Sequence, residues 1–216
     1  MIMILFRIEG YNYQRESGDM EINSKEIIKK IERNFNEVIE EEIILGAIKL
    51  SKVRRFEKGD IILGMGEAME KAYFIMSGIA RSYYLDMEGN DITKSFIKEY
   101  EFCVGESIIT TQKSGEGFEA LENMIVLEFN AKQLKEYLFS HQGLTRIYVK
   151  ILEKTILYKM NRENGFQIKS ATERYLDFRK NSPNIENRVN QSYIASYLGI
   201  TAVSLSRIKR TIKEEN

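Results

Sequence analysis

The residues of this chain that could carry chemistry are concentrated near its C-terminus. Between Asn187 and Lys213 there are five basic residues and no acidic one. A local positive face of this kind can neutralise DNA phosphates even in a chain whose 32 basic and 32 acidic residues cancel. By contrast, the segment from Glu21 to Glu42 holds seven glutamates against four basic residues. The neutral total therefore hides two regions of opposite charge, and the C-terminal region favours a nucleic-acid partner.

The same segment has the residue pattern of a helix-turn-helix. Gly199 separates two short stretches with apolar residues at helical spacing, and Asn190 and Thr201 stand where each helix needs an N-cap. In such a motif the second helix enters the major groove of DNA. We assign base contacts to Ala202, Val203, Ser206 and Arg207, phosphate contacts to Thr201, Ser204, Lys209 and Arg210, and a further DNA contact to Gln191. The alternative is a generic helical hairpin.

Few other residues could support catalysis or hold a cofactor. The chain has one cysteine, Cys103, and one histidine, His141, and it lacks a P-loop and a GxSxG motif, which argues against an enzyme. A single thiolate excludes an iron–sulfur cluster and a structural zinc site. Haem is not expected because the sole histidine, His141, directly precedes a long predicted helix. We therefore predict no cofactor and no metal, although a redox change at Cys103 could act as a switch.

The segment from about residue 51 to 130 consists of short β-like runs between glycine turns, which predicts a barrel or sandwich. The expected strands are Val53–Phe56, Ile61–Leu63, Tyr73–Met76, Ile79–Leu85, Ile92–Ile97, Phe118–Leu121 and Met124–Phe129. Before them we expect an amphipathic helix with Ser24 as its N-cap and a short helix over Glu42–Lys49. After them, the sequence following Asn130 resembles a capping box and begins another helix.

A longer helix is expected from Leu144 to Arg162, with two apolar stripes side by side. Leu144, Tyr148, Ile151 and Tyr158 form the first stripe, and Val149, Leu152, Ile156 and Met160 form the second. A helix with two stripes covers two surfaces, so we predict that one packs on the β domain and the other on a second copy of the helix. A core helix of a monomer is the alternative. Asn164-Gly165 is a predicted hinge, and a further helix begins at Ser170 and ends before Pro183.

The N-terminus carries no targeting signal that the residues reveal. Residues 1–19 lack periodicity and are expected to be a non-native or flexible extension, with translation starting at Met20 as one hypothesis. The apolar run at residues 1–6 is too short for a signal peptide or a membrane span. Together with the lone cysteine, this favours a cytoplasmic protein without a membrane partner.

This order of elements resembles the Crp/Fnr family of bacterial transcription regulators over about residues 25–213. The segments that carry the resemblance are Arg55–Asp60, Tyr73–Gly78, the hairpin at Gly89, Gly105-Glu106, Ala171–Leu176 and Ile194–Ile208. The resemblance implies an α+β fold: a cyclic-nucleotide-binding-like, antiparallel, jelly-roll-like β-roll as sensor domain (residues 20–140), a dimerisation helix and hinge (141–164) and a winged helix-turn-helix (165–216). It also implies a homodimer, double-stranded palindromic DNA and RNA polymerase as partners, and a small-molecule effector.

The residues at the expected effector pocket depart from the cyclic-AMP-responsive members of that family. Those members use a Gly-Glu pair for the ribose, an Arg-Ser pair for the phosphate and a Thr-Ser pair for the base. Gly105 and Glu106 match the first pair, but Ser114-Gly115 and Lys159-Met160 stand at the other two positions. A phosphate without a guanidinium loses its bidentate, charge-assisted bonds. We therefore predict an effector other than cyclic AMP, in a pocket that includes Gly105, Glu106, Lys113, Ser114 and Met160.

Taken together, these features predict a sequence-specific DNA-binding regulator that contacts a palindrome through the helix at residues 202–210. The alternative is an effector-binding module whose basic C-terminal helices dock a protein partner instead of DNA.

Overall fold

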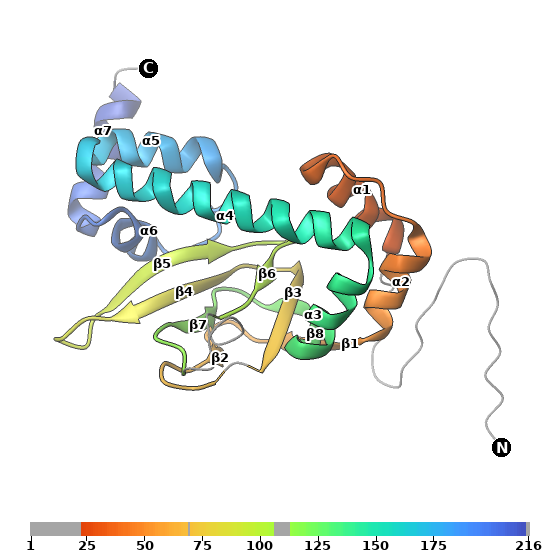
Figure 1. Cartoon of the computed structure of the whole chain (residues 1–216). Helices are drawn as coiled ribbons and strands as arrows, with labels where there is room; N and C mark the ends of the chain where they lie inside the picture. The colour runs from red at the N-terminus through yellow and green to blue at the C-terminus, as the bar shows by residue number, and fades with distance from the viewer. Residues whose placement is uncertain (1–22, 69, 106–112, 215–216) are drawn as a thin grey trace.

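The computed structural model describes residues 23–68, 70–105 and 113–214. The predicted extension at residues 1–19, the hypothetical start at Met20 and the pocket residue Glu106 lie outside these ranges. In the described part of the chain, a β-roll occupies the centre, a long helix crosses it, and smaller helices lie at either end (Figure 1).

The β-roll consists of two antiparallel sheets of four strands each within the described residues. Its strands are β1 (Ser51–Phe56), β2 (Ile61–Leu63), β3 (Lys71–Ser77), β4 (Ala80–Leu85), β5 (Asp91–Ile97), β6 (Phe102–Cys103), β7 (Gly117–Ala120) and β8 (Met124–Asn130). The strand orders are β1-β8-β3-β6 and β2-β7-β4-β5. Alternate side chains such as Ile75, Ala80 and Val126 point between the sheets and are fully buried. The predicted antiparallel, jelly-roll-like domain is confirmed.

The strand predictions hold to within a few residues, with β6 as the exception. The predicted hairpin loop after β4 is present, with Gly89 at a φ of +83° and Asp86 accepting backbone hydrogen bonds from Glu88 and Asn90. β6 was not predicted because two residues are too short to show alternation. It pairs with β3 through Tyr73 and Cys103, and so closes the edge of its sheet.

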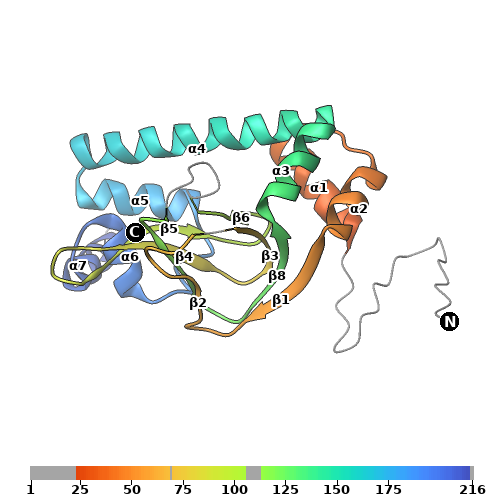
Figure 2. The same cartoon turned by 60° about the horizontal axis from the view of Figure 1, so that its bottom comes forward.

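Three helices surround the start of the long helix α4 (Gln142–Ile168): α1 (Ser24–Phe35), α2 (Glu41–Lys49) and α3 (Ala131–Ser140). The N-cap of α1 is Asn23, which accepts a hydrogen bond from the Glu26 amide, and Ser24 is the first helical residue instead of the predicted cap. Ile27, Ile44 and Leu144 share one buried cluster. Figure 2 shows these helices at the opposite end of α4 from the C-terminal helices.

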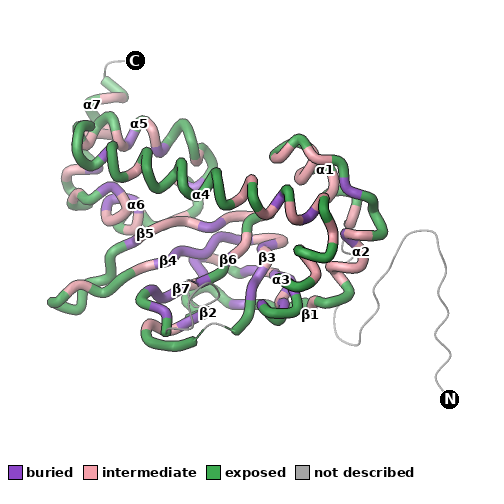
Figure 3. Tube along the Cα trace, in the orientation of Figure 1, coloured by how far each residue is buried: buried purple, intermediate pink, exposed green. Residues whose placement is uncertain are grey.

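Both predicted stripes of α4 are present, and they have different surroundings. The first is covered at its start, where Leu144 is buried and Ile151 packs against the cluster formed with α1 and α2. The second stripe is exposed over its whole length; Ile156, for example, is 58% exposed. Figure 3 shows exposed positions along the middle of α4. An apolar surface on this helix therefore lacks a partner within the described residues of one chain.

The predicted interruption at Asn164-Gly165 is wrong, because α4 continues to Ile168. A single glycine costs a helix only about 1 kcal/mol. Contacts hold this end of α4 in place: Arg162 donates to the Tyr197 carbonyl at 2.8 Å, and the Phe166 ring lies against Gly199. The helix ends instead at Lys169, its C-cap. Ser170 then begins the next helix as its N-cap, with a complete capping box.

The C-terminal domain, residues 171–214, contains α5 (Ala171–Asn181), α6 (Gln191–Leu198) and α7 (Ala202–Glu214). The predicted wing is wrong, since the described residues of this domain contain helices and turns but no strand. The segment between α5 and α6 is nine residues of turns, residues 182–190, that includes Pro183. Its apolar residue Ile185 is buried in the helical core. A segment anchored in this way lacks the alternating pattern that a hairpin needs.

The C-terminal domain packs directly on the β-roll. Ile79 and Leu121 of the β-roll belong to the same buried cluster as Phe178, Ile194 and Leu205 of the helices. Phe96 of β5 makes ring contacts with both Phe178 and Tyr197, at centroid distances of 6.0 and 5.5 Å. The two domains therefore share one buried apolar cluster in this state, separate from the core between the two sheets.

Candidate nucleic-acid interface

The helices α6 and α7 form a helix-turn-helix with the predicted caps. The Asn190 side chain accepts from the Ser192 amide at 3.0 Å, and the Thr201 hydroxyl accepts from the Ser204 amide at 3.1 Å. Gly199 ends α6 at a φ of +67°, the left-handed region that glycine adopts without strain. Ile194, Ala195, Leu198 and Leu205 are buried between the helices. The two predicted N-caps and the glycine turn are present, and the role of this helix pair in DNA binding stays a prediction.

The predicted base-contacting side chains lie together on the outer surface of α7. Ala202, Val203, Ser206 and Arg207 are all exposed, and Val203 reaches 61% exposure. They occupy the start of the helix, which is the part that meets base edges in helix-turn-helix complexes. Among the described residues no ion pair holds the Arg207 guanidinium. This surface can enter a groove without first rearranging its own side chains.

Two of the five basic residues of this segment are neutralised inside the protein. Lys209 pairs with Glu186 at 2.7 Å, and its ammonium also donates to the Gln191 amide oxygen at 2.9 Å. Gln191 in turn donates to the Glu186 carbonyl at 3.0 Å. Although burial opposes it, the hydrogen bond from Lys209 lowers the pKa of Glu186. These two predicted DNA contacts therefore brace α7 against α6 in this state.

The second neutralised residue is Arg188, whose guanidinium contacts Glu99 and Glu122 of the β-roll. The sequence count of charges missed these pairs, because it started one residue after Glu186 and because the other two partners are distant in sequence. Of the basic residues, Arg207, Arg210 and Lys213 remain exposed. Thr201 and Ser204, the predicted phosphate contacts, share a hydroxyl–hydroxyl hydrogen bond of 3.0 Å at the start of α7.

A buried arginine that sequence analysis did not single out stands where the domains meet. Arg81 of β4 is 2% exposed and donates to both oxygens of Asp91, to Glu119 and to the Thr93 hydroxyl, over 2.7 to 3.1 Å. Its guanidinium lies 3.8 Å from the centroid of the Tyr193 ring of α6. Burial opposes its charge, but the hydrogen bonds to the carboxylates raise the pKa of Arg81. Arg81 thus joins β4 of the β-roll to α6.

In the described part of the expected effector pocket, the nearby cation is held in an internal ion pair. A bound phosphate would need a cation that is free to pair with it. Ser114 is buried and its hydroxyl donates to the Glu116 carbonyl at 2.8 Å. The Glu116 carboxylate, also buried, pairs with Lys94 at 2.7 Å. A cyclic phosphate next to Ser114 would meet a carboxylate whose counter-ion is already engaged. Among the described residues beside Ser114, the Lys94 ammonium is therefore already paired.

The other described residues of the predicted pocket differ in their exposure to solvent. Gly105 is buried, whereas Lys113 is exposed on the following loop and Met160 is exposed on α4. Cys103 is completely buried in the core of the β-roll, and desolvation there raises the pKa of its thiol, which disfavours the reactive thiolate. This environment gives no support to a redox switch at Cys103.

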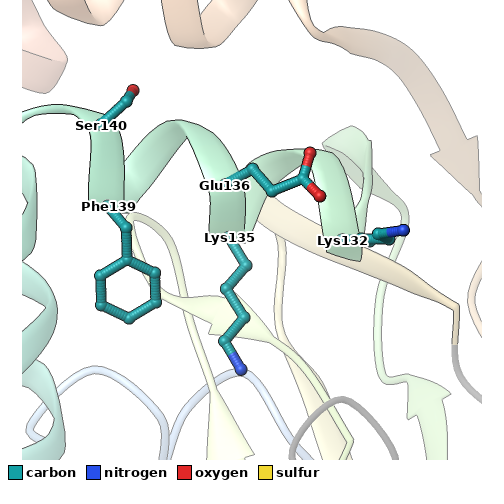
Figure 4. Close-up of a pocket in the computed structure, with 5 residues that line it drawn as sticks. All are labelled: Lys132, Lys135, Glu136, Phe139 and Ser140. Atoms are coloured by element: carbon teal, nitrogen blue, oxygen red, sulfur yellow. The ribbon is translucent and has the colours of Figure 1, made fainter.

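A shallow, open depression lies on the outer surface of α3, lined by Lys132, Lys135, Glu136, Phe139 and Ser140. Figure 4 shows Phe139 and Lys135 extending to the same side of the helix. None of the predicted effector residues lines it. Among the described residues, no three His, Cys, Asp or Glu side chains cluster in a way that could hold a metal ion. In the same residues, no helix has the length and apolar character needed to cross a bilayer.

Comparison with known protein families gives one match, which covers the β-roll. Residues 53–141 match the cyclic nucleotide-binding domain. No curated protein sequence matches the chain.

Solved structures with a similar fold are found at low sequence identity. A CooA mutant from Carboxydothermus hydrogenoformans superposes with a TM-score of 0.65 at 18% identity over 79% of each chain. The c-di-GMP responsive global regulator CLP from Xanthomonas campestris gives 0.65 at 16% identity, over 82% of this chain and 93% of its own. FixK2 from Bradyrhizobium japonicum gives 0.64 at 18% identity, over 76% and 85%. Residues 53–141 are thus similar to the cyclic nucleotide-binding domain, and the chain has a fold similar to that of these three solved structures.

Proposed function

We propose that this chain is a DNA-binding transcription regulator of the Crp/Fnr type, which contacts a palindromic site through α7. The observation that carries the proposal is the geometry of α6 and α7. Ile194, Ala195, Leu198 and Leu205 are buried between the two helices. Ala202, Val203, Ser206 and Arg207 form an exposed surface at the start of α7. Of these, Arg207 has the fork geometry to bond guanine O6 and N7.

The proposal includes a homodimer built on α4. The exposed stripe of Val149, Leu152, Ile156 and Met160 supports it, because apolar residues at this spacing favour side-by-side helices. Two copies related by a two-fold axis would present two α7 helices, which matches half-sites about 34 Å apart. RNA polymerase is the proposed further partner.

An effector other than cyclic AMP completes the proposal. The buried Lys94–Glu116 pair beside Ser114 supports this choice, since it leaves no free buried cation there among the described residues. We propose that the effector acts on the β-roll and changes how the C-terminal domain is held against it.

The test is selection of bound duplexes from a random pool by the purified full chain, followed by gel shifts of the selected site at several salt concentrations. We expect an inverted repeat, with affinity that falls as salt rises. The variant Arg207→Ala should weaken binding to that site by about tenfold or more. Arg33→Ala, an exposed arginine on α1 at the far end of the molecule, is the matched control and should bind like the wild type. Failure of the folded dimer to bind any duplex at low salt would favour a protein partner instead.

A further inference from the structure

Arg188 has an unusual position for a residue of the basic C-terminal segment, because it faces acidic groups of the sensor domain. It lies two residues before Asn190, the N-cap of α6. Its Nη1 donates to Glu99 Oε2 at 3.1 Å, its Nη2 donates to Glu99 Oε1 at 2.5 Å, and Nη2 also contacts a carboxylate oxygen of Glu122. Glu99 comes from the turn after β5, and Glu122 from the turn between β7 and β8.

The two glutamates present to Arg188 the same chemistry that a DNA backbone would present. Paired oxyanions in bidentate geometry match the planar fork of a guanidinium, as phosphate oxygens do. Glu99 is fixed in place because it also accepts a hydrogen bond from the Gly78 amide at 3.1 Å. Burial opposes its ionisation, but the hydrogen bond from Arg188 lowers the pKa of Glu99, so the carboxylate stays charged. The site holds one arginine between two full negative charges.

The position of Arg188 is also suited to DNA. In helix-turn-helix complexes the first helix of the motif crosses the sugar-phosphate backbone, and Arg188 immediately precedes that helix. The pairs are open to solvent at the edge of the domain contact, since the Arg188 side chain is 32% exposed. By contrast, the central contacts are covered: the Thr93 amide donates to the Ser196 hydroxyl at 3.0 Å, next to the stacked Arg81 and Tyr193. An exposed ion pair can exchange one anion for another at small cost.

We propose that Glu99 and Glu122 act as an internal substitute for DNA phosphates, which holds Arg188 and keeps the C-terminal domain docked on the β-roll. When the domain separates from the sheet, Arg188 becomes an additional contact with the DNA backbone. The inference rests on the proposed DNA-binding function, and it assigns a DNA contact outside α6 and α7.

The experiment compares the full-length wild type with the double variant Glu99→Gln/Glu122→Gln, which keeps the shape of both side chains and removes both charges. Hydrogen–deuterium exchange of the backbone amides over residues 91–97 and 191–198 reports on docking without any DNA. Binding to the selected duplex over a series of salt concentrations reports on Arg188. Glu40→Gln/Glu136→Gln is the matched control, because it removes two exposed charges at the α2 and α3 end of the molecule, opposite the C-terminal helices.

The double variant is expected to exchange both segments faster, to bind DNA at least threefold more tightly, and to steepen the dependence of log affinity on log salt by about one unit. Adding Arg188→Met to it should return the slope to that of the wild type while the fast exchange remains. Unchanged exchange would overturn the clamp, and faster exchange without tighter binding would overturn the role of Arg188 on DNA. If neither wild type nor variant binds any duplex, the proposed function fails as well, whereas the exchange measurement still decides whether the clamp exists.

Discussion

Replacing Arg81 by alanine should cost this protein a large part of its stability. The side chain is almost fully buried and satisfies Asp91, Glu119 and Thr93 through hydrogen bonds of 2.7 to 3.1 Å. Removal of one partner from a buried ion pair typically costs about 3–5 kcal/mol, because the remaining charge is left unpaired. Asp91 is partly exposed, so water can compensate for some of this loss. We therefore expect the low end, about 3 kcal/mol, or a fall in Tm of roughly 6–12 °C for a chain of this length.

The pH dependence gives this prediction a second, independent test. The hydrogen bond from Arg81 lowers the pKa of Asp91 in the folded protein. A carboxyl group with a lowered folded-state pKa stabilises the fold above its unfolded pKa, about 3.9, and this contribution is lost as the pH falls through the folded-state value. The variant lacks that contribution at every pH. The difference in unfolding free energy between wild type and Arg81→Ala should therefore shrink as the pH is lowered below about 4.

The assay is urea unfolding followed by far-ultraviolet circular dichroism at several pH values. Arg54→Ala is the matched control, since that arginine also pairs with a β-roll glutamate but is about half exposed. An exposed pair is worth about 0–1 kcal/mol, so the control should be close to the wild type. A loss below about 1 kcal/mol for Arg81→Ala at neutral pH, or a loss that does not change down to pH 3, would refute this account of Arg81.

Four further predictions concern other parts of the molecule. Gly199→Ala should lower the free energy of unfolding by about 1–2 kcal/mol, because Gly199 has a φ of +67° and the Phe166 ring lies nearby. Gly89→Ala, with a φ of +83° and open space around it, measures the backbone strain without a steric clash. Ile156→Glu should raise the dimer dissociation constant at least tenfold in sedimentation. Val38→Glu, which changes an exposed apolar residue outside α4, should leave it unchanged. Calorimetry with cyclic AMP should show no micromolar binding, and a positive result would point to Lys113. Arg207→Ala should lose about 1–3 kcal/mol of discrimination between bases at particular positions of the site. Arg210→Ala should weaken binding to all DNA sequences alike, and equal effects of both variants on all sequences would contradict the assigned roles.

The features that could be predicted from the sequence are those that depend on neighbouring residues. The helix-turn-helix is specified by two caps and one glycine within twelve residues, from Asn190 to Thr201, and each is found in the predicted role. The β-roll follows from short alternating runs separated by turns, such as the one at Gly89. In both cases local propensity and burial favour the same structure.

The features that could not be predicted depend on residues distant in sequence. Arg188 was counted as part of a free basic face, but its partners Glu99 and Glu122 lie 89 and 66 positions away. Arg81 gave no sign of its role, because nothing in its own strand shows that Tyr193 stacks on it. The predictions of a wing and of a hinge at Gly165 were wrong for a related reason. Tertiary contacts of Ile185 and Phe166 override the local sequence pattern.

The continuity of α4 makes it a mechanical lever. Its start is held by α1 and α2, partly through the Glu37 carboxylate, which binds both Arg146 and Lys150. From Leu144 to Ile168 the helix extends for about 36 Å at roughly 1.5 Å per residue. A tilt of about 5° at the held end would therefore move the far end by about 3 Å, close to the axial spacing of about 3.4 Å between neighbouring bases on one DNA strand. A small tilt of α4 at its start would thus be amplified at the end where Arg162 contacts α6.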